Sequence, residues 1–193
     1  MENTLANAIT QSMPLTPTTA CAEGCEEMTW LDAARRGEPW ALEQFYGAYQ
    51  TQVHSLCSRM MMRSEDAEDA MQATFVQAFR AIGRFRGESS AKTWLYRIAM
   101  NQCISMLRRR RDDKEVPEHM AVPDESGKVV DRLSVHTALR RVSPDNRAIL
   151  ALRYWEDMEC DEIAGVLGIT LSAAKMRLFR ARAEFRKHYE GEI

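Results

Sequence analysis

Apolar residues recur at spacings of three and four through most of this chain, and this repeat constrains its fold more than any other feature. The clearest run would lie on one face of a long helix: Leu42, Phe45, Tyr49, Val53, Leu56 and Met60. Similar stripes predict helices from Ser64 to about Phe79 and from Ala91 to Arg110, then four shorter helical segments over 133–142, 145–154, 159–167 and 172–189. No segment alternates with the period of a strand, so the sequence predicts an all-α protein.

Two stretches without this repeat divide the chain. The first, 1–27, carries Pro14 and Pro17 and has no Lys or Arg. The second, 112–132, contains seven acids, three bases, Pro117 and Pro123, a composition typical of a flexible linker. We therefore expect a flexible N-terminal extension, two small helical domains and an acidic linker between them, with the boundaries 1–27, 28–111, 112–132 and 133–193.

The net charge of −2 hides two basic blocks. Residues 80–111 carry nine bases and one acid, and they end in four consecutive arginines. Residues 174–188 carry six bases and one acid. Such clustering favours polyanion-binding surfaces, although basic residues also solvate ordinary helix faces.

Several classes of protein are disfavoured. No stretch approaches the ~18 uninterrupted apolar residues of a membrane span, and the N-terminus lacks a secretory signal, so we expect no membrane insertion. Five scattered cysteines do not form a disulfide framework, and a reducing cytoplasm is the expected setting. No phosphate-binding glycine loop, nucleophile elbow or catalytic triad is present, so we expect neither catalytic residues nor a cofactor.

Residues 161–185 have the pattern of a helix-turn-helix. Ile163, Val166 and Leu167 provide apolar contacts, and Ala164 permits a close helix crossing. Gly168 suits the turn, and Ser172 is a good N-cap for the second helix. That helix has a predicted core stripe with cations outside it, as in helices that enter a major groove: Ala174, Leu178, Ala181 and Phe185.

A family resemblance follows from these segments taken in order. The succession DAEDAMQATFVQAF (66–79), FRGES (85–89), TWLYRIAMN (93–101) and LRRRR (107–111) resembles region 2 of the extracytoplasmic-function (group IV) sigma factors of bacterial RNA polymerase. The helix-turn-helix, ending RLFRAR (177–182), resembles their region 4. The resemblance covers about residues 30–188. It implies a sigma factor that binds core polymerase, recognises the −10 and −35 promoter elements and serves a stress or envelope/metal response.

The resemblance also implies partners and site residues. The partners are bacterial RNA polymerase core, promoter DNA and an anti-sigma factor, and the setting is cytoplasmic. Docking on the polymerase clamp would use an acidic helix: Asp66, Glu68, Asp69, Gln72 and Phe75. The −10 element would be held by a loop and the helix after it: Arg86, Ser89, Ser90, Lys92, Trp94, Tyr96, Arg97, Asn101, Arg108 and Arg109. Trp94 is equally suited to the core.

The −35 element would be contacted by the second helix of the helix-turn-helix. Its candidate residues are Ser172, Lys175, Met176, Arg177, Phe179, Arg180 and Arg182. The family commonly shows Gly-Thr-Val-Lys-Ser-Arg here, but Ala173 and Met176 stand at the Thr and Ser positions. Two hydroxyl groups are therefore absent, and the preferred −35 sequence stays open.

Two alternatives remain. A stand-alone helix-turn-helix regulator would need neither the acidic docking helix nor the −10-like loop. A metal- or redox-sensing site could be built from four soft ligands, although Cys57 also suits the core: Cys21, Cys25, His54 and Cys57.

Overall fold

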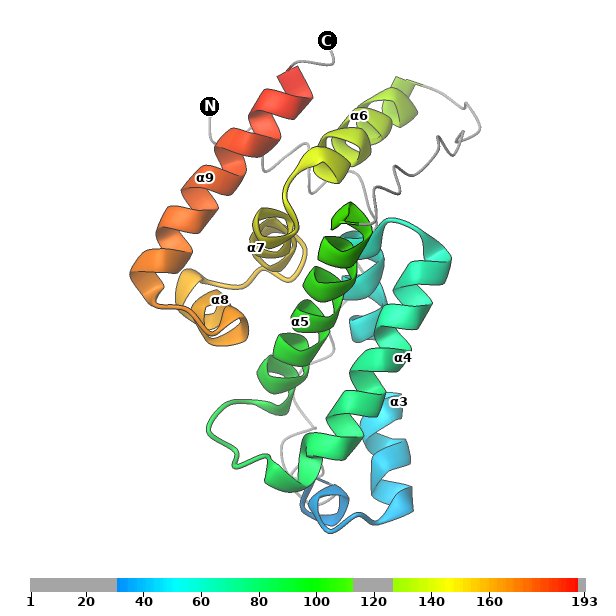
Figure 1. The fold of residues 1–193 in the computed structure, drawn as a ribbon. Helices are drawn as coiled ribbons and strands as arrows, with labels where there is room; N and C mark the ends of the chain where they lie inside the picture. Colours follow the sequence, from blue (N-terminus) through cyan, green and yellow to red (C-terminus); the bar gives the residue numbers. More distant parts are fainter. Residues whose placement is uncertain (1–30, 113–126, 191–193) are drawn as a thin grey trace. The chain divides into compact units, whose positions relative to one another are not determined.

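The computed structural model describes residues 31–112 and 127–190, with side chains described for 31–110 and 134–190. These ranges are helical apart from short connections, and no strand occurs within them (Figure 1). The chain divides into two compact units, and the division falls after Cys103, within a helix. The all-α, two-domain prediction is confirmed. The predicted extension at 1–27 and residues 113–126 of the predicted linker lie outside the described residues.

The N-terminal unit consists of a short helical segment, 31–35, followed by longer helices. These are α3 (Pro39–Met61), α4 (Ser64–Ala81), the 3-10 turn η1 (Ile82–Arg84) and α5 (Ala91–Asp112), whose last residues lie beyond the division. Pro39 occupies the first turn of α3, where a missing N–H costs nothing. Helix α3 ends at Met61, and the next residue, Met62, caps it: its backbone is left-handed (φ 61°) and its N–H donates to the Ser58 carbonyl at 2.9 Å.

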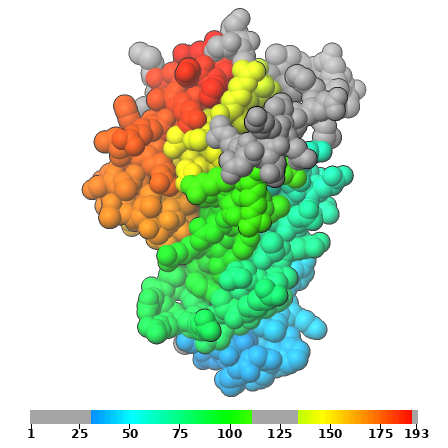
Figure 2. All heavy atoms as spheres, viewed as in Figure 1, coloured from blue at the N-terminus to red at the C-terminus, as the bar shows by residue number. Residues whose placement is uncertain are grey.

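An aromatic cluster forms the core of the N-terminal unit. Phe45 of α3 is its centre, with ring centroids 5.2 Å from Tyr49 and 6.4 Å from each of Phe75, Phe79 and Trp94. These contacts join α3, α4 and the first turn of α5 around one ring. Figure 2 shows the atoms of α4, in teal, beside those of α5, in green.

The C-terminal unit is built around its last helix. Its elements are α6 (Gly127–Arg141), α7 (Pro144–Tyr154), α8 (Cys160–Leu167) and α9 (Leu171–Glu190). Helix α9 contacts the other three, and its predicted core stripe is buried. Gly168 ends α8 with φ 65°, the left-handed conformation expected for this turn. Ala164 is buried, as a close crossing of α8 and α9 requires.

Three helix starts differ from the sequence prediction. Ser64 is the first residue of α4 rather than its cap, and extended Arg63 precedes it. Helix α6 begins at Gly127, six residues earlier than expected and inside the predicted linker. Ser172 lies in the first turn of α9, and the capping role belongs to Thr170, whose hydroxyl accepts the Ala173 N–H at 3.2 Å. Thr170 and Ser172 both carry a hydroxyl group that could cap this helix, and only the backbone conformation decides between them.

Candidate nucleic-acid and polymerase interfaces

The loop between η1 and α5 is held at both ends. At its start, the Phe85 N–H donates to the Ile82 carbonyl at 3.0 Å. At its end, the Ser90 hydroxyl accepts the Thr93 N–H at 3.0 Å and lies 2.8 Å from the Thr93 hydroxyl. Ser90 thus caps α5, a structural use of a residue predicted to contact DNA. Gly87 turns the loop with φ 73°, a conformation that a side chain disfavours.

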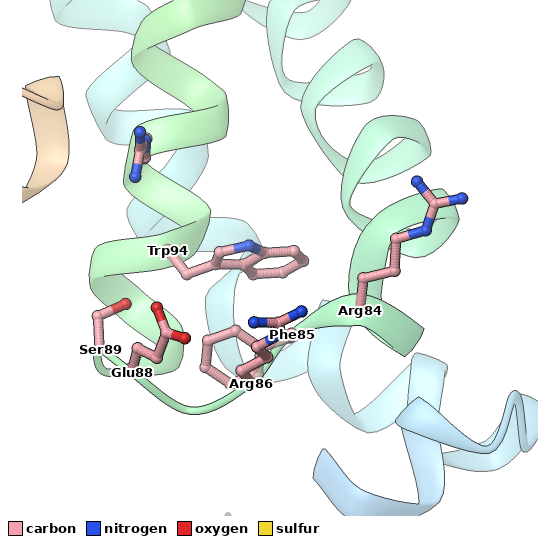
Figure 3. Close-up of a pocket in the computed structure, with 7 residues that line it drawn as sticks. Arg84, Phe85, Arg86, Glu88, Ser89 and Trp94 are labelled. Carbon is pink, nitrogen blue, oxygen red and sulfur yellow. The ribbon is translucent and has the colours of Figure 1, made fainter.

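The end of η1, this loop and the start of α5 line an open pocket of about 290 Å³. In Figure 3 the Trp94 indole lies above the loop, with Glu88 and Ser89 to one side and Arg84 to the other. Guanidinium groups, one carboxylate and two aromatic rings therefore line one pocket. The lining residues are Arg84, Phe85, Arg86, Glu88, Ser89, Trp94 and Arg97.

The aromatic wall of the cavity rests on the core. The Trp94 and Phe85 ring centroids are 5.1 Å apart, and the Trp94 ring also meets Phe45 edge-on. On the Phe85 ring, the Arg35 guanidinium carbon lies 6.0 Å from the centroid. Trp94 is half-buried, so it both packs in the core and lines the cavity. The core role and the DNA-contact role predicted for Trp94 therefore concern two parts of one side chain.

Sequence reasoning found only part of the cavity. Four residues that the sequence predicts to contact the −10 element line this pocket: Arg86, Ser89, Trp94 and Arg97. Three further lining residues were not among the predicted contacts: Arg84 of η1, and Phe85 and Glu88 of the loop. The available signal was sequence position: Phe85 and Glu88 lie inside the matched FRGES segment (85–89), and Arg84 directly precedes it.

Other predicted −10 residues lie elsewhere. Tyr96 is fully buried, with the Lys92 ammonium 5.2 Å from its ring, so the prediction that Tyr96 stacks on an unpaired base is wrong. Helix periodicity turns it toward the core, two residues after the outward part of Trp94. Asn101, Arg108 and Arg109 are exposed farther along α5.

The acidic face of α4 is partly as predicted. Glu68, Asp69 and Gln72 are exposed. Asp66 is only 5% exposed, with the Arg63 Nε 4.0 Å from its carboxylate, and therefore does not belong to the open face. Val76, 48% exposed, extends this face by one turn and was missed, although its spacing from Asp69 and Gln72 would have indicated it.

Phe75 also leaves the predicted docking surface. It is 3% exposed, and its ring packs against Tyr46 at 4.7 Å and Phe79 at 6.0 Å. A side chain so enclosed stabilises the α3–α4 packing and has no surface to offer polymerase.

The outward face of α9 combines cations with apolar side chains. Lys175 and Arg180 are exposed, as is Ser172. Between them lie Met176, 52% exposed, and Phe179, 70% exposed, an unusual exposure for side chains of their size. All five remain available to a major groove.

Two predicted DNA contacts of α9 instead face α7. The Arg177 Nη1 lies 3.7 Å from the Asp145 carboxylate, and the Arg182 guanidinium carbon lies 5.8 Å from the Tyr154 ring centroid. Both arginines are half-buried. Their charge is engaged within the unit, so we remove them from the set of outward-facing DNA contacts.

The predicted soft-ligand site is not assembled in the described part of the chain. Cys57 is fully buried, and its sulfur lies 3.8 Å from that of Cys103. The hydrogen bond to Cys57 and burial raise the pKa of Cys103 well above its ordinary value. His54 and Cys57 form no cluster of three or more ligand side chains within residues 31–110 and 134–190. Cys21 and Cys25 lie outside the described residues.

The fold and these surfaces define a class: an all-α protein with a helix-turn-helix unit, a motif typical of DNA-binding proteins, and a second unit bearing an arginine-lined pocket. None of the helices in the described ranges has the length and apolar character needed to cross a membrane.

Comparisons with known proteins identify the family. Residues 45–112 match Sigma-70 region 2, and residues 132–185 match Sigma-70, region 4. The chain is 30% identical over 179 residues to the RNA polymerase sigma-H factor of Pseudomonas aeruginosa, covering 81% of this chain and 90% of that protein. It is 31% identical over 155 residues to the ECF RNA polymerase sigma factor SigM of Mycobacterium tuberculosis, covering 79% of each.

Solved structures share the fold. CnrH, determined in complex with the cytosolic domain of CnrY, has a TM-score of 0.65 at 22% identity and covers 86% of this chain and 99% of its own. RpoE of Bartonella quintana, crystallised with the anti-sigma factor NepR, has a TM-score of 0.61 at 23% identity and covers 77% and 96%.

The chain belongs to the extracytoplasmic-function sigma factors. It is an alternative sigma factor of RNA polymerase, a protein of transcription initiation whose family binds core polymerase and promoter DNA.

Proposed function

We propose that this sigma factor divides promoter recognition between its two units. The N-terminal unit, with helices α3, α4 and the start of α5, docks on core polymerase and holds the −10 element, and the C-terminal unit, with helices α6 to α9, reads the −35 element. The segment between α5 and α6 tethers them, and 1–27 is an extension outside both. The protein acts in the cytoplasm, where promoter DNA and polymerase meet, and performs no catalysis of its own.

The observation that carries this proposal is the cavity beside Trp94. Unstacking and extruding a base costs a few kcal/mol, which the protein must return through contacts to that base. Trp94 offers an aromatic surface, Glu88 an acceptor, and Arg84, Arg86 and Arg97 donors for base edges or phosphates. A stand-alone duplex-binding regulator has no use for such a cavity, so we favour the sigma role for this surface.

Docking on polymerase is assigned to the open face of α4. Glu68, Asp69 and Gln72 present charge and hydrogen-bonding groups, and Val76 adds an apolar contact at the end of the same face. Acidic groups beside a small apolar patch suit a basic partner helix, where charge orients the encounter and burial adds affinity.

We propose an anti-sigma factor as a further partner. Support comes from two proteins of the same fold, CnrH and the Bartonella RpoE, whose structures were determined in complex with the cytosolic domain of CnrY and with the anti-sigma factor NepR, respectively. Control by such a partner suits a stress or envelope/metal response, because a bound sigma factor is released without new synthesis.

Run-off transcription tests the proposal directly. Bacterial core polymerase is supplied with promoter fragments from the chain's own genome, with and without this protein. We expect discrete transcripts only when the protein is present. Binding to core without promoter-dependent transcripts would contradict the promoter role, and failure to bind core would contradict the whole assignment.

A pair of arginine variants tests the cavity. Arg97→Ala removes a guanidinium from the cavity, whereas Arg36→Ala removes an exposed one that pairs with Glu38 at 2.9 Å. We expect R97A to reduce run-off transcription and promoter melting, the latter followed by permanganate reactivity of unpaired thymines. R36A should match the wild type. Equal activity of all three proteins would contradict the cavity assignment.

A further inference from the structure

The outward face of α9 carries an apolar stripe with cations on both sides. Successive residues of a helix turn by about 100°, so Ser172, Met176, Phe179 and Ala183 follow one another along the face opposite the buried stripe. All four are exposed. Lys175 and Arg186 lie on one flank, and Arg180 and Lys187 on the other.

This arrangement is unlike a surface that reads bases by hydrogen bonds. Beyond Ser172, the centre of the stripe offers no donor or acceptor side chain. Met176 is 52% exposed and Phe179 is 70% exposed, so each presents substantial apolar surface to whatever α9 meets. Exposed apolar groups placed together commonly mark an interaction site.

The flanking charges indicate what covers the stripe. Four cations in two rows match the phosphates on either side of a groove, and they would repel a basic protein surface. In the major groove the apolar group on a base edge is the C5-methyl of thymine. We propose that Met176 and Phe179 read the −35 element by packing against thymine methyl groups, which makes the methyl groups themselves a determinant of promoter choice.

This inference rests on the proposed −35 role of α9, and it deepens that role by naming the group recognised. The cations supply affinity that is independent of sequence, while the apolar pair supplies the preference for thymine. Promoters of this protein should accordingly carry thymines, on either strand, where the middle of α9 meets the groove.

Replacing thymine by uracil in the −35 element tests the proposal, because it removes the methyl group and leaves base pairing intact. Holoenzyme made from core polymerase and the full chain is titrated with a promoter fragment found by run-off transcription. The fragment is prepared with thymine or with uracil throughout the −35 element. A third fragment carries the same number of uracils in the spacer.

We expect wild-type holoenzyme to lose about fourfold in affinity for each contacted methyl removed from the −35 element, the effect of one buried carbon, and to tolerate the spacer substitution. Met176→Ala combined with Phe179→Ala should bind the thymine and uracil promoters equally. Leu171→Ala removes an apolar side chain that is 43% exposed but lies off the stripe, so it should keep the wild-type preference. Circular dichroism checks that each variant is folded.

Two results would overturn the inference. In the first, wild-type holoenzyme initiates from the promoter but binds thymine and uracil fragments equally, which leaves the −35 role intact and removes methyl readout. In the second, the double variant keeps the thymine preference, which assigns methyl contacts to other residues. Absence of promoter-specific initiation by the wild type would instead contradict the proposed function itself.

Discussion

The Glu184 carboxylate of α9 accepts two hydrogen bonds from Ser143, one from its backbone N–H and one from its hydroxyl, each at 2.9 Å. The Asn146 side-chain amide donates to the same carboxylate. Ser143 is the N-cap of α7 but makes no cap hydrogen bond with its own side chain. A carboxylate from the recognition helix therefore takes over the capping role at the N-terminus of α7, where the helix dipole favours negative charge.

Glu184→Gln should destabilise the protein. The amide keeps the shape of the side chain but replaces one acceptor oxygen with a donor that faces Ser143 and Asn146. We expect a loss of about 1–2 kcal/mol in the free energy of unfolding, measured by urea denaturation. The matched control is Glu190→Gln, because Glu190 is exposed and its ion pair with Arg186 is long, at 4.0 Å. Glu190→Gln should change the free energy of unfolding by less than about 0.5 kcal/mol. Equal effects of the two variants would contradict the capping role.

The same carboxylate should make stability depend on pH. Burial raises the pKa of Glu184, but hydrogen bonds from Asn146 and Ser143 outweigh burial and lower it below its ordinary 4.5. The unfolded chain then binds more protons than the folded chain between the lowered pKa and 4.5. The contribution of Glu184 is therefore complete above about pH 4.5 and is lost as the pH falls through the lowered pKa.

Comparing wild type with Glu184→Gln isolates this dependence. The pKa of His136 is also lowered from 6.5, by burial first and then by Arg140 and Arg147, so acid destabilises the protein through His136 as well. That effect begins near pH 6.5 and is common to both proteins. The difference between their urea midpoints should be constant from pH 7 to 5 and shrink below 4.5. A difference that persists unchanged to pH 3 would refute the assignment.

Two neighbouring residues of α4, Phe75 and Val76, differ in burial and should therefore differ in their contribution to stability. Phe75→Ala removes a ring that is 3% exposed and packed against Phe45, Tyr46 and Phe79, so we expect a loss of about 3–5 kcal/mol in stability. Val76→Ala, at a position 48% exposed, should change stability by less than about 0.5 kcal/mol. Thermal unfolding of both variants tests this. A stable F75A protein that fails to bind polymerase would restore Phe75 to the docking surface.

The features of the fold and site that could be predicted from the sequence are those determined by residues close to one another in the chain. The helices and the turn at Gly168 follow from apolar spacing and backbone preference, which act within a few residues. Phe75 and Tyr96 were misjudged because a matched motif mixes residues that face a partner with residues that hold the motif in place. Only burial in the folded chain distinguishes the two kinds.

The sequence also did not show which arginines of α9 are available to DNA. Arg177 and Arg182 look like DNA contacts beside Lys175 and Arg180, since all four are basic. Their partners Asp145 and Tyr154 come from α7, more than twenty residues earlier in the chain. Long-range pairing of this kind leaves no local signal. The pocket beside Trp94 was only partly predicted for a different reason: its lining residues are close in sequence, but the path of the loop decides which of their side chains converge.

The open face of α4 yields the sharpest test of polymerase docking. Asp69 is exposed and flanked by Gln72 and Val76, so Asp69→Arg reverses a charge there without entering the core. Juxtaposing like charges in an interface costs enough that we expect at least a tenfold loss of affinity for core polymerase, about 1.4 kcal/mol, measured by fluorescence titration of labelled protein. Glu43→Arg, a reversal of an exposed acid on α3, serves as the control and should bind normally. Raising the salt concentration should narrow the gap between D69R and wild type, because screening weakens exposed charge pairs. If D69R binds core as tightly as E43R at low salt, the docking surface lies elsewhere on the unit.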